Sequence, residues 1–411
     1  MNVKKILVII LFILVIFGLS FALYWVFFRQ ATTTPTGDNI TNSGNLPNIP
    51  EGTPQVTNNN NSNIPTLPGQ IFDTSKVSKV ANGGLTEVSQ VGTAPVVGLS
   101  KNNSGVNFYD QAKQQFFRIN ANGQVELLSD KLFYGVSGVT WSNSGDKAII
   151  EYPDGMNVLY NFKDQKQTTI PQEMQEFSFN KQGDAIAAKW FSDASQNNPD
   201  NNWIVAAKDD GSGLALVEKL GDQSYSTQIA ISPDNQVAAL HEKSIDNLRQ
   251  MVYPIGFNGE SLQAFEVAGS GFTSQWSPNG NSLVYSVYNS QTDYLPNLWV
   301  TSGKTGEMGQ IKVSLNLNTW PDKCTYADES TMFCAVPQGL PRGAGIYPEI
   351  SYQYPDNFYR VDLGSGVKTL LASPVGSEGA YSGYNLTVSP DGTMLYFMDR
   401  NSSTLQSIRL K

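Results

Sequence analysis

Apolar and polar positions alternate along most of the chain, in pairs of short segments joined by a tight turn. The clearest pair is LTVSPDGTMLYFMDR at residues 386–400, where Ser-Pro-Asp-Gly separates two alternating segments. A period of two is typical of half-buried β-strands, and Pro, Asp and Gly are the residues that tight turns favour. The pattern therefore predicts a β-hairpin here.

The same hairpin pattern occurs six more times upstream. The copies lie at residues 97–109, 139–150, 177–188, 229–240, 274–287 and 324–336, and the first and last of these are weaker than the others. Each copy is followed by a third β segment, and every copy except the last one in the chain also by a short fourth segment. Spacings of about 37 to 62 residues include the repeat lengths of propeller blades.

A four-stranded sheet has two faces to bury and cannot bury both alone, so such sheets stack around a common axis. The last copy lacks its fourth segment, whereas an extra β segment at 83–92 precedes the first copy. Pairing these two ends closes the ring and removes the open edges. We expect an all-β protein, a seven-bladed β-propeller over residues 83–411 whose N-terminal strand closes the last blade. Six or eight blades stay open as alternatives, because two copies are weak.

The Ser-Pro-Asp-Gly hairpins resemble those of the TolB-type propellers, which are relatives of the WD-repeat folds. The resemblance covers about residues 83–411 and is strongest at 232–235, 277–280 and 389–392. It implies a propeller of the cell envelope that often serves as a protein-binding platform, without implying a particular partner. The sequence has no counterpart of the α/β domain of TolB or of the hydrolase domain of prolyl peptidases, so those roles are not carried over.

The N-terminal region follows a different pattern. A pair of lysines precedes an uninterrupted apolar run at 6–28, which as a helix reaches about 35 Å, enough to cross a bilayer core. The lysines predict that residues 1–5 are cytoplasmic and that the rest is translocated. A signal peptide cleaved after the small-x-small motif at 20–22 is the alternative, although the run is long for one. Residues 29–82, rich in Thr, Asn, Pro, Gly and Ser, are predicted to form a disordered linker.

The amino-acid composition limits the kinds of binding site that the protein can form. The net charge of −9 and the sparse Lys and Arg give no support for nucleic-acid binding. Two cysteines and a single histidine exclude a zinc cluster, and we expect no metal site and no cofactor. His241 lies in an expected strand and the sequence contains no nucleophile-elbow motif, so we interpret it as a satisfied or solvent-facing strand histidine and not as a general base. The segment 208–213 lacks the carboxylate spacing of a calcium loop and is predicted to be a turn.

The two cysteines flank one of the weaker hairpin turns. Antiparallel pairing centred near Glu329 places Cys324 opposite Cys334, at about 4.5–5.5 Å between Cα atoms. That separation permits a disulfide, and the expected compartment is oxidising. We predict a structural disulfide, with two buried thiols as the alternative.

Loop length indicates a binding face. In a propeller blade, the connections after the second and fourth strands emerge on one side, and nearly all long connections belong to this class: 191–202, 288–297, 316–323, 337–357 and 373–385. They are rich in residue types that are enriched at interface hot spots. The predicted binding residues are Tyr294, Trp320, Arg342, Tyr347, Tyr352, Tyr354, Tyr381 and Tyr384. The alternative is that these side chains pack the loops onto the ring.

The leading hypothesis is a membrane-anchored extracytoplasmic propeller whose long-loop face binds an envelope protein or peptide. A second hypothesis is a propeller that binds or cleaves carbohydrate, because aromatic platforms suit sugars and this face carries four carboxyl groups: Asp293, Asp322, Glu349 and Asp356. Cleavage requires two carboxyls about 5–9.5 Å apart, which the sequence does not place. A third is a spacer or assembly subunit of a surface apparatus. A binding module is favoured over an enzyme, and no catalytic residue is assigned.

Overall fold

The computed structural model describes residues 76–102, 105–191, 202–377 and 379–411. Their regular structure is β-strand apart from short 3₁₀ turns, namely η2 (Ser224–Ser226), η3 (Ser290–Thr292), η4 (Pro321–Lys323) and η5 (Pro348–Gln353). No helix among these residues combines the length and the apolar character that a membrane crossing requires. The segments 1–5 and 6–28 and most of the predicted linker lie outside the described residues.

Strands that are consecutive in the sequence form antiparallel four-stranded sheets, and four of these sheets are separate. They contain β5 (Gly138–Trp141), β6 (Lys147–Glu151), β7 (Asn157–Asn161) and β8 (Lys166–Ile170); β9 (Met174–Phe179), β10 (Ala185–Trp190), β11 (Trp203–Lys208) and β12 (Ala215–Lys219); β13 (Thr227–Ile229), β14 (Val237–Ser244), β15 (Gln250–Gly256) and β16 (Phe265–Val267); and β17 (Ser270–Trp276), β18 (Ser282–Tyr288), β19 (Asn297–Ser302) and β20 (Lys312–Ser314).

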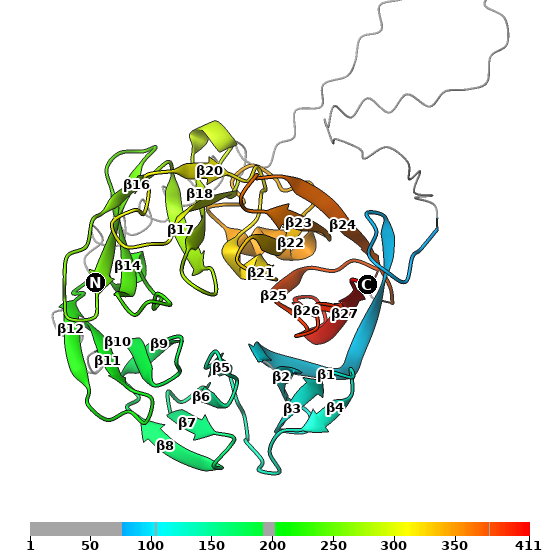
Figure 1. Ribbon diagram of the computed structural model, residues 1–411, viewed down its shortest axis with the longest axis horizontal. Helices are drawn as coiled ribbons and strands as arrows, with labels where there is room; N and C mark the ends of the chain where they lie inside the picture. Colours follow the sequence, from blue (N-terminus) through cyan, green and yellow to red (C-terminus); the bar gives the residue numbers. More distant parts are fainter. Residues whose placement is uncertain (1–75, 103–104, 192–201, 378) are drawn as a thin grey trace, which may run out of the picture. The chain divides into compact units, whose positions relative to one another are not determined.

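The other strands are joined through the long strand β1 (Leu85–Asn102) into one eleven-stranded sheet. Its remaining members are β2 (Gly105–Asp110), β3 (Gln115–Asn120), β4 (Val125–Leu127), β21 (Cys324–Tyr326), β22 (Thr331–Pro337), β23 (Asp356–Asp362), β24 (Lys368–Val375), β25 (Gly383–Val388), β26 (Met394–Asp399) and β27 (Thr404–Arg409). Figure 1 shows the strand groups following one another around a central axis, with β5, β9, β17, β21 and β25 on the inside. This arrangement is that of a β-propeller.

Strand β1 joins the two ends of the folded region. Its first part pairs antiparallel with β27, where Val88 lies opposite Ile408, and its second part pairs with β2. The sequence predicts the pairing with the last strand. It does not predict that segment 83–92 and the next strand are continuous, nor that the beginning of β1 runs parallel to β24. One strand therefore connects three groups of strands.

The folded region begins before residue 83. The backbone N–H of Ser78 donates to the carbonyl of Leu85, and the N–H of Ala81 donates to the carbonyl of Arg409, both at 2.8 Å. The predicted linker boundary at residue 82 is therefore corrected, because residues from Ser78 onward are bonded to strands. Linker-like composition does not prevent a short segment from pairing when a sheet edge is available.

The hairpin turns explain why Ser, Asp and Gly recur. In four copies a serine Oγ accepts a hydrogen bond from the backbone N–H five residues later, in the pairs Ser142–Lys147, Ser232–Val237, Ser277–Ser282 and Ser389–Met394. The residue three positions after the serine has a positive φ, which Gly and Asn tolerate best; examples are Gly280 at 77° and Asn235 at 62°. These residue types therefore serve the turn itself.

Neighbouring sheets are connected at a repeated position, directly before the turn serine or its equivalent. An aromatic side chain there donates a hydrogen bond to a backbone carbonyl of the preceding sheet. The bonds are Trp141 Nε1 to Gly98 O at 3.2 Å, Trp276 Nε1 to Ala230 O at 3.2 Å and Tyr326 Oη to Gln275 O at 3.4 Å. Each acceptor lies two residues before the turn position of its own sheet, so the contact repeats along the inner strands.

Replacing Trp276 by phenylalanine should test this connection. The substitution keeps most of the ring but removes the N–H, so the partly buried carbonyl of Ala230 loses its donor. We expect the free energy of unfolding to fall by about 1 kcal/mol in urea titrations. Trp299→Phe is the matched control, because Trp299 is also half-buried but stacks on Tyr285. Equal losses in the two variants would count against the connection.

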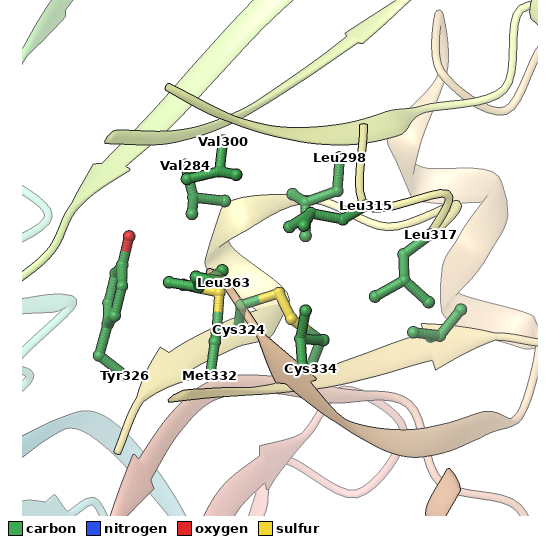
Figure 2. Packing of buried hydrophobic residues seen from close by; sticks show 12 residues of the cluster. Val284, Leu298, Val300, Leu315, Leu317, Cys324, Tyr326, Met332, Cys334 and Leu363 are labelled. Atoms are coloured by element: carbon green, nitrogen blue, oxygen red, sulfur yellow. A yellow bond between two sulfur atoms is a disulfide. The ribbon is translucent and has the colours of Figure 1, made fainter. Parts of the chain in front are cut away.

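The hydrophobic core lies between adjacent sheets. One cluster packs Val284, Leu298, Val300, Leu315 and Leu317 from one side against residues of the next sheet, among them Tyr326, Met332 and Leu363 (Figure 2). Cys324 and Cys334 belong to this cluster and form a disulfide. They face each other across β21 and β22, with 4.1 Å between their Cα atoms, slightly closer than the sequence predicts.

Removal of this disulfide should weaken the fold without abolishing it. The bridge closes a short loop, with a sequence separation of 10, so the chain-entropy estimate of its contribution is about 3 kcal/mol. Replacing both cysteines by alanine should lower the free energy of unfolding by about that amount, measured in urea. Dithiothreitol should lower the stability of the natural protein and leave the alanine variant unchanged. A reductant effect in the variant would contradict this assignment.

Candidate binding face

The long connections between strands contact one another on one side of the ring. The N–H of Gly343 donates to the carbonyl of Asp293 at 2.9 Å, which joins the β22–β23 and β18–β19 connections. The N–H of Arg400 donates to the carbonyl of Ser382 at 2.9 Å, which joins the β26–β27 and β24–β25 connections. We call this surface the long-loop face; its described segments are 289–296, 316–323, 338–355, 376–377, 379–382 and 400–403. The predicted loop residues 192–201 lie outside the described residues.

Two of the predicted binding residues are buried. Trp320 is 7% exposed and Tyr381 is 1% exposed, and the Tyr381 ring packs edge-on against Phe397, with 6.1 Å between centroids. The prediction is corrected for these two residues, because buried rings are not available to a binding partner. For them the alternative interpretation, packing of the loop onto the ring, holds.

The other predicted residues lie at or near the surface. Tyr347 is 62% exposed, and the neighbouring Ile346 is 42% exposed. Arg342 is exposed, and four tyrosines are half-buried: Tyr294, Tyr352, Tyr354 and Tyr384. The connection between β22 and β23 therefore places an apolar and aromatic surface beside a basic side chain.

Arg342 and Tyr294 form one of two arginine–tyrosine contacts on this face. The Arg342 guanidinium carbon lies 5.7 Å from the centre of the Tyr294 ring. Tyr294 also packs against Tyr288, with 6.5 Å between ring centroids. The two tyrosines come from the end of β18 and from the connection after it. Together these contacts position Arg342 against aromatic surface.

The second contact joins Arg400 to two tyrosine rings. Its guanidinium carbon lies 4.3 Å from the centre of the Tyr352 ring and 4.1 Å from that of Tyr384. Nη2 of Arg400 also donates to Oδ2 of Asp322 at 3.1 Å. Burial raises the pKa of Tyr384, so its hydroxyl is neutral near pH 7. We call Arg400, Tyr352 and Tyr384 the Arg400 stack. Tyr352 belongs to η5, Tyr384 to the start of β25, and Arg400 to the start of the β26–β27 connection.

A buried ion pair lies directly beside the Arg400 stack in the sequence and in space. Lys323 and Asp356 have side chains that are 2% and 0% exposed, with 2.9 Å between Nζ and Oδ2. Lys323 Nζ also donates to the carbonyl of Gly383 at 2.8 Å, and the N–H of Gly383 donates to Asp356 Oδ2 at 2.6 Å. Burial raises the pKa of Asp356 to about 6, against the lowering effect of Lys323. The pair ties η4, β23 and β25 together.

The four carboxyl groups considered for carbohydrate chemistry do not share one environment. Asp356 is buried in the pair just described, and Asp322 is bonded to Arg400. Asp293 and Glu349 are exposed. Across the described residues, no three His, Cys, Asp or Glu side chains come close enough to hold a metal ion. Moreover, the Tyr352 and Tyr384 rings each have Arg400 stacked on a face, where a sugar would otherwise stack.

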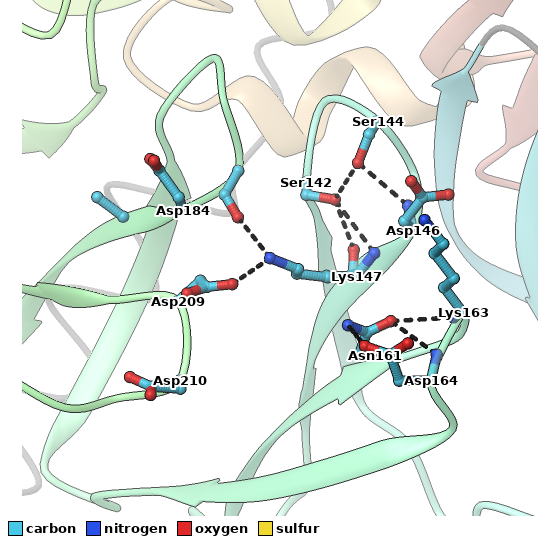
Figure 3. Close-up of polar contacts among 12 residues, drawn as sticks. Ser142, Ser144, Asp146, Lys147, Asn161, Lys163, Asp164, Asp184, Asp209 and Asp210 are labelled. Carbon is cyan, nitrogen blue, oxygen red and sulfur yellow. Dashed lines mark hydrogen bonds and ion pairs between the residues drawn. The ribbon is translucent and has the colours of Figure 1, made fainter.

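The other candidates serve local structure. His241 Nδ1 lies 2.9 Å from Thr227 Oγ1 across β14 and β13, and burial lowers the pKa of the imidazole. In the turn at 208–213, Asp210 Oδ1 accepts from the N–H of Ser212 at 2.9 Å. Asp209 pairs with Lys147 of the preceding sheet, a contact that Figure 3 shows next to the Ser142 turn. The turn's carboxylates are thus used within the fold.

Sequence reasoning missed Arg400, Lys323 and Ile346. Arg400 follows the second strand of the last hairpin, so its connection belongs to the class that predicts the long-loop face, but the connection is too short to attract notice. Lys323 and Ile346 lie inside the long connections 316–323 and 337–357. A lysine in a polar loop gives no sign of burial, because burial depends on its partner Asp356, 33 residues away.

No protein-family model matches this chain, and no curated protein matches it. Among solved structures, the β-propeller domain of Cps50 (Swd1) from Myceliophteria thermophila matches with a TM-score of 0.50 and 10% identity, over 79% of this chain and all of that one. A chain of the mitotic checkpoint complex matches at 0.49 and 13%, covering 85% and 99%, and an oligogalacturonate lyase in complex with manganese at 0.48 and 11%, covering 81% and 99%. Identities this low are informative about fold alone, and by its likeness to the Cps50 domain the chain has a β-propeller fold.

Proposed function

We propose that this protein is a binding platform whose long-loop face docks a protein or peptide of the cell envelope. The observation that carries the proposal is the exposed pair Ile346 and Tyr347, beside Arg342 and near two arginine–tyrosine contacts. Tyrosine and arginine supply rigid amphipathic area with polar groups, which is the composition of interface hot spots. Exposed apolar residues mark an interaction site when they are grouped rather than single, and Ile346 and Tyr347 are adjacent in one connection.

The proposal includes the finer architecture and the location. The propeller has seven blades of the TolB type, the last built from β25, β26, β27 and the first part of β1. The apolar segment 6–28 anchors it in the membrane with residues 1–5 in the cytoplasm, and residues 29–77 form a tether. The disulfide between Cys324 and Cys334 fits an oxidising, extracytoplasmic compartment.

Site-specific photo-crosslinking in cells tests the binding face. A photoreactive amino acid replaces Tyr347 in the full chain, and a matched variant carries it at Tyr225, which is 86% exposed and follows β12 on another part of the ring. We expect discrete crosslinked products from position 347 and none of these products from position 225. Identical product patterns from the two positions, or no product from position 347, would exclude this face.

An N-terminal tag tests the anchor separately. If 6–28 is a signal anchor, the tag stays on the protein and sediments with the membrane after carbonate extraction. A cleaved signal peptide would release the tagged fragment and leave a shortened, tag-free protein, which would refute the anchor and leave the binding face untouched.

A further inference from the structure

The Arg400 stack fixes a guanidinium group at the surface of the long-loop face. The group lies over the rings of Tyr352 and Tyr384, with its central carbon 4.3 Å and 4.1 Å from the two ring centres. Cation–π contacts with two rings restrict its movement, so the group is held in place before any ligand arrives. The side chain is 23% exposed, so part of it is accessible to a ligand. A planar, pre-oriented guanidinium is the group that recognises carboxylates with two parallel hydrogen bonds.

The guanidinium has more donors than the fold uses. Arginine offers five N–H donors. The described side-chain contacts of Arg400 include a single hydrogen bond, from Nη2 to Asp322 Oδ2 at 3.1 Å. Its Nε is buried and has no acceptor among the described residues. An unsatisfied buried donor costs free energy, and none of the described residues supplies the missing acceptor.

Asp322 is suited to give way to another carboxylate. Its side chain is 59% exposed and contacts Arg400 through one oxygen. Two other charged groups nearby are already engaged: Lys323 with Asp356, and Asp399 through hydrogen bonds from the N–H of Ser382 and from Ser402. Release of Asp322 into water costs little, because its carboxylate is mostly solvated already and makes one hydrogen bond to Arg400.

We propose that Arg400 is a carboxylate-recognition residue of the long-loop face, and that a carboxylate of the bound peptide replaces Asp322. This inference rests on the proposed function and specifies its ligand as a peptide that carries an acidic side chain or a free C-terminal carboxylate. The two tyrosines hold the guanidinium, and Ile346 and Tyr347 offer apolar contacts on the same connection as Tyr352. Asp322 acts as an internal competitor that occupies the guanidinium when no ligand is bound.

Four pools of fluorescent nonapeptides test the proposal on the full-length protein in detergent. The pools carry glutamate or glutamine at the central position, each with a free or an amidated C-terminus, so the two sources of carboxylate are separated. We expect at least one carboxylate-bearing pool to bind about tenfold or more tighter than the glutamine, amidated pool. Arg400→Gln should abolish the difference, and Arg400→Lys should reduce it, because lysine lacks the planar fork.

Asp322→Asn gives an effect in the opposite direction. Without its internal competitor, Arg400 should bind the preferred pool severalfold tighter, a gain that a merely loosened fold does not produce. Arg249→Gln is the matched control, because Arg249 lies in the β14–β15 connection, outside the segments that define the long-loop face, and pairs with Asp246 and Glu266; its loss should leave every pool unaffected.

The outcomes separate this inference from the proposed function. Equal binding of all four pools, unchanged by Arg400→Gln and Asp322→Asn, would overturn carboxylate recognition while crosslinking at Tyr347 still supported the binding face. Absence of binding by every pool would count against carboxylate recognition, and absence of crosslinking as well would count against both.

Discussion

Replacing Lys323 by methionine should lower the free energy of unfolding by about 3–5 kcal/mol at neutral pH, which is the usual cost of removing one partner of a buried ion pair. Asp356 would be left buried without its cation, and the carbonyl of Gly383 would lose a donor. Part of this loss would be avoided by protonation of Asp356, so the variant should be less destabilised in acid. Urea titrations at neutral and mildly acidic pH measure both effects.

A double variant separates the pair from its surroundings. Lys323→Met combined with Asp356→Asn has no buried charge, and the asparagine carbonyl can still accept from the N–H of Gly383. We expect it to regain most of the stability that the single variant loses, because apolar or neutral replacements of a buried pair are often close to neutral. Arg249→Met should change stability little, since its ion pairs are exposed. Comparable losses in the single and double variants would refute the interpretation.

The buried pair should also make stability depend on pH. Burial raises the pKa of Asp356 to about 6 in the folded protein, above the ordinary value of 3.8. The folded state therefore binds this proton more tightly than the unfolded state does, so this group favours folding below about pH 4 and that contribution is lost as the pH rises through 6. The natural protein should lose stability over this window relative to the double variant. A difference that is constant with pH would contradict the raised pKa.

Val88→Asp should destabilise the ring closure by about 4 kcal/mol or more. Val88 is 7% exposed and packs in a cluster with Phe333, Leu395 and Ile408. Its loss removes about 1.5–3 kcal/mol of burial, and a carboxyl group in this position has no partner, which adds the cost of an unsatisfied polar group. Because β1 also holds β2 and β24, we expect earlier exposure of these strands, measured by hydrogen exchange.

The neighbouring residue provides the control for this prediction. Ser89 pairs with Ser407 in the same ladder, but its side chain is exposed. Ser89→Asp should therefore keep most of the stability, since the carboxylate stays in water. If the two substitutions have the same effect, strand pairing alone and not burial of Val88 governs closure.

Much of the fold can be predicted from short stretches of the sequence. Period-two alternation identifies the strands, and the turn residues identify the hairpins because a positive φ and a serine bond to the backbone act within five residues. The unequal ends of the repeat indicate that an N-terminal strand pairs with the last one. The continuity of β1 and its parallel pairing with β24 cannot be predicted in this way, because no local sequence pattern indicates which sheet edge a strand will pair with.

Only the general location of the candidate binding face can be predicted from the sequence. Loop lengths indicate which connections gather on one side, yet the fate of each side chain there depends on its neighbours. Trp320 and Tyr381 resemble Tyr347 in the sequence, but the first two are buried while the third is exposed to water. Aromatic residues are common both in protein cores and at binding interfaces. The residue type alone therefore does not show which of the two environments a given ring occupies.

The sequence by itself determined the class of fold, the hairpin repeat and the identity of the two cysteines that face each other. Only the tertiary structure decided which polar groups became partners. Lys323 meets Asp356 across 33 residues, and Arg400 meets Asp322 across 78. Strand and turn preferences act between residues close in the chain, whereas ion pairs and stacked rings depend on distances that arise only when separate sheets pack together.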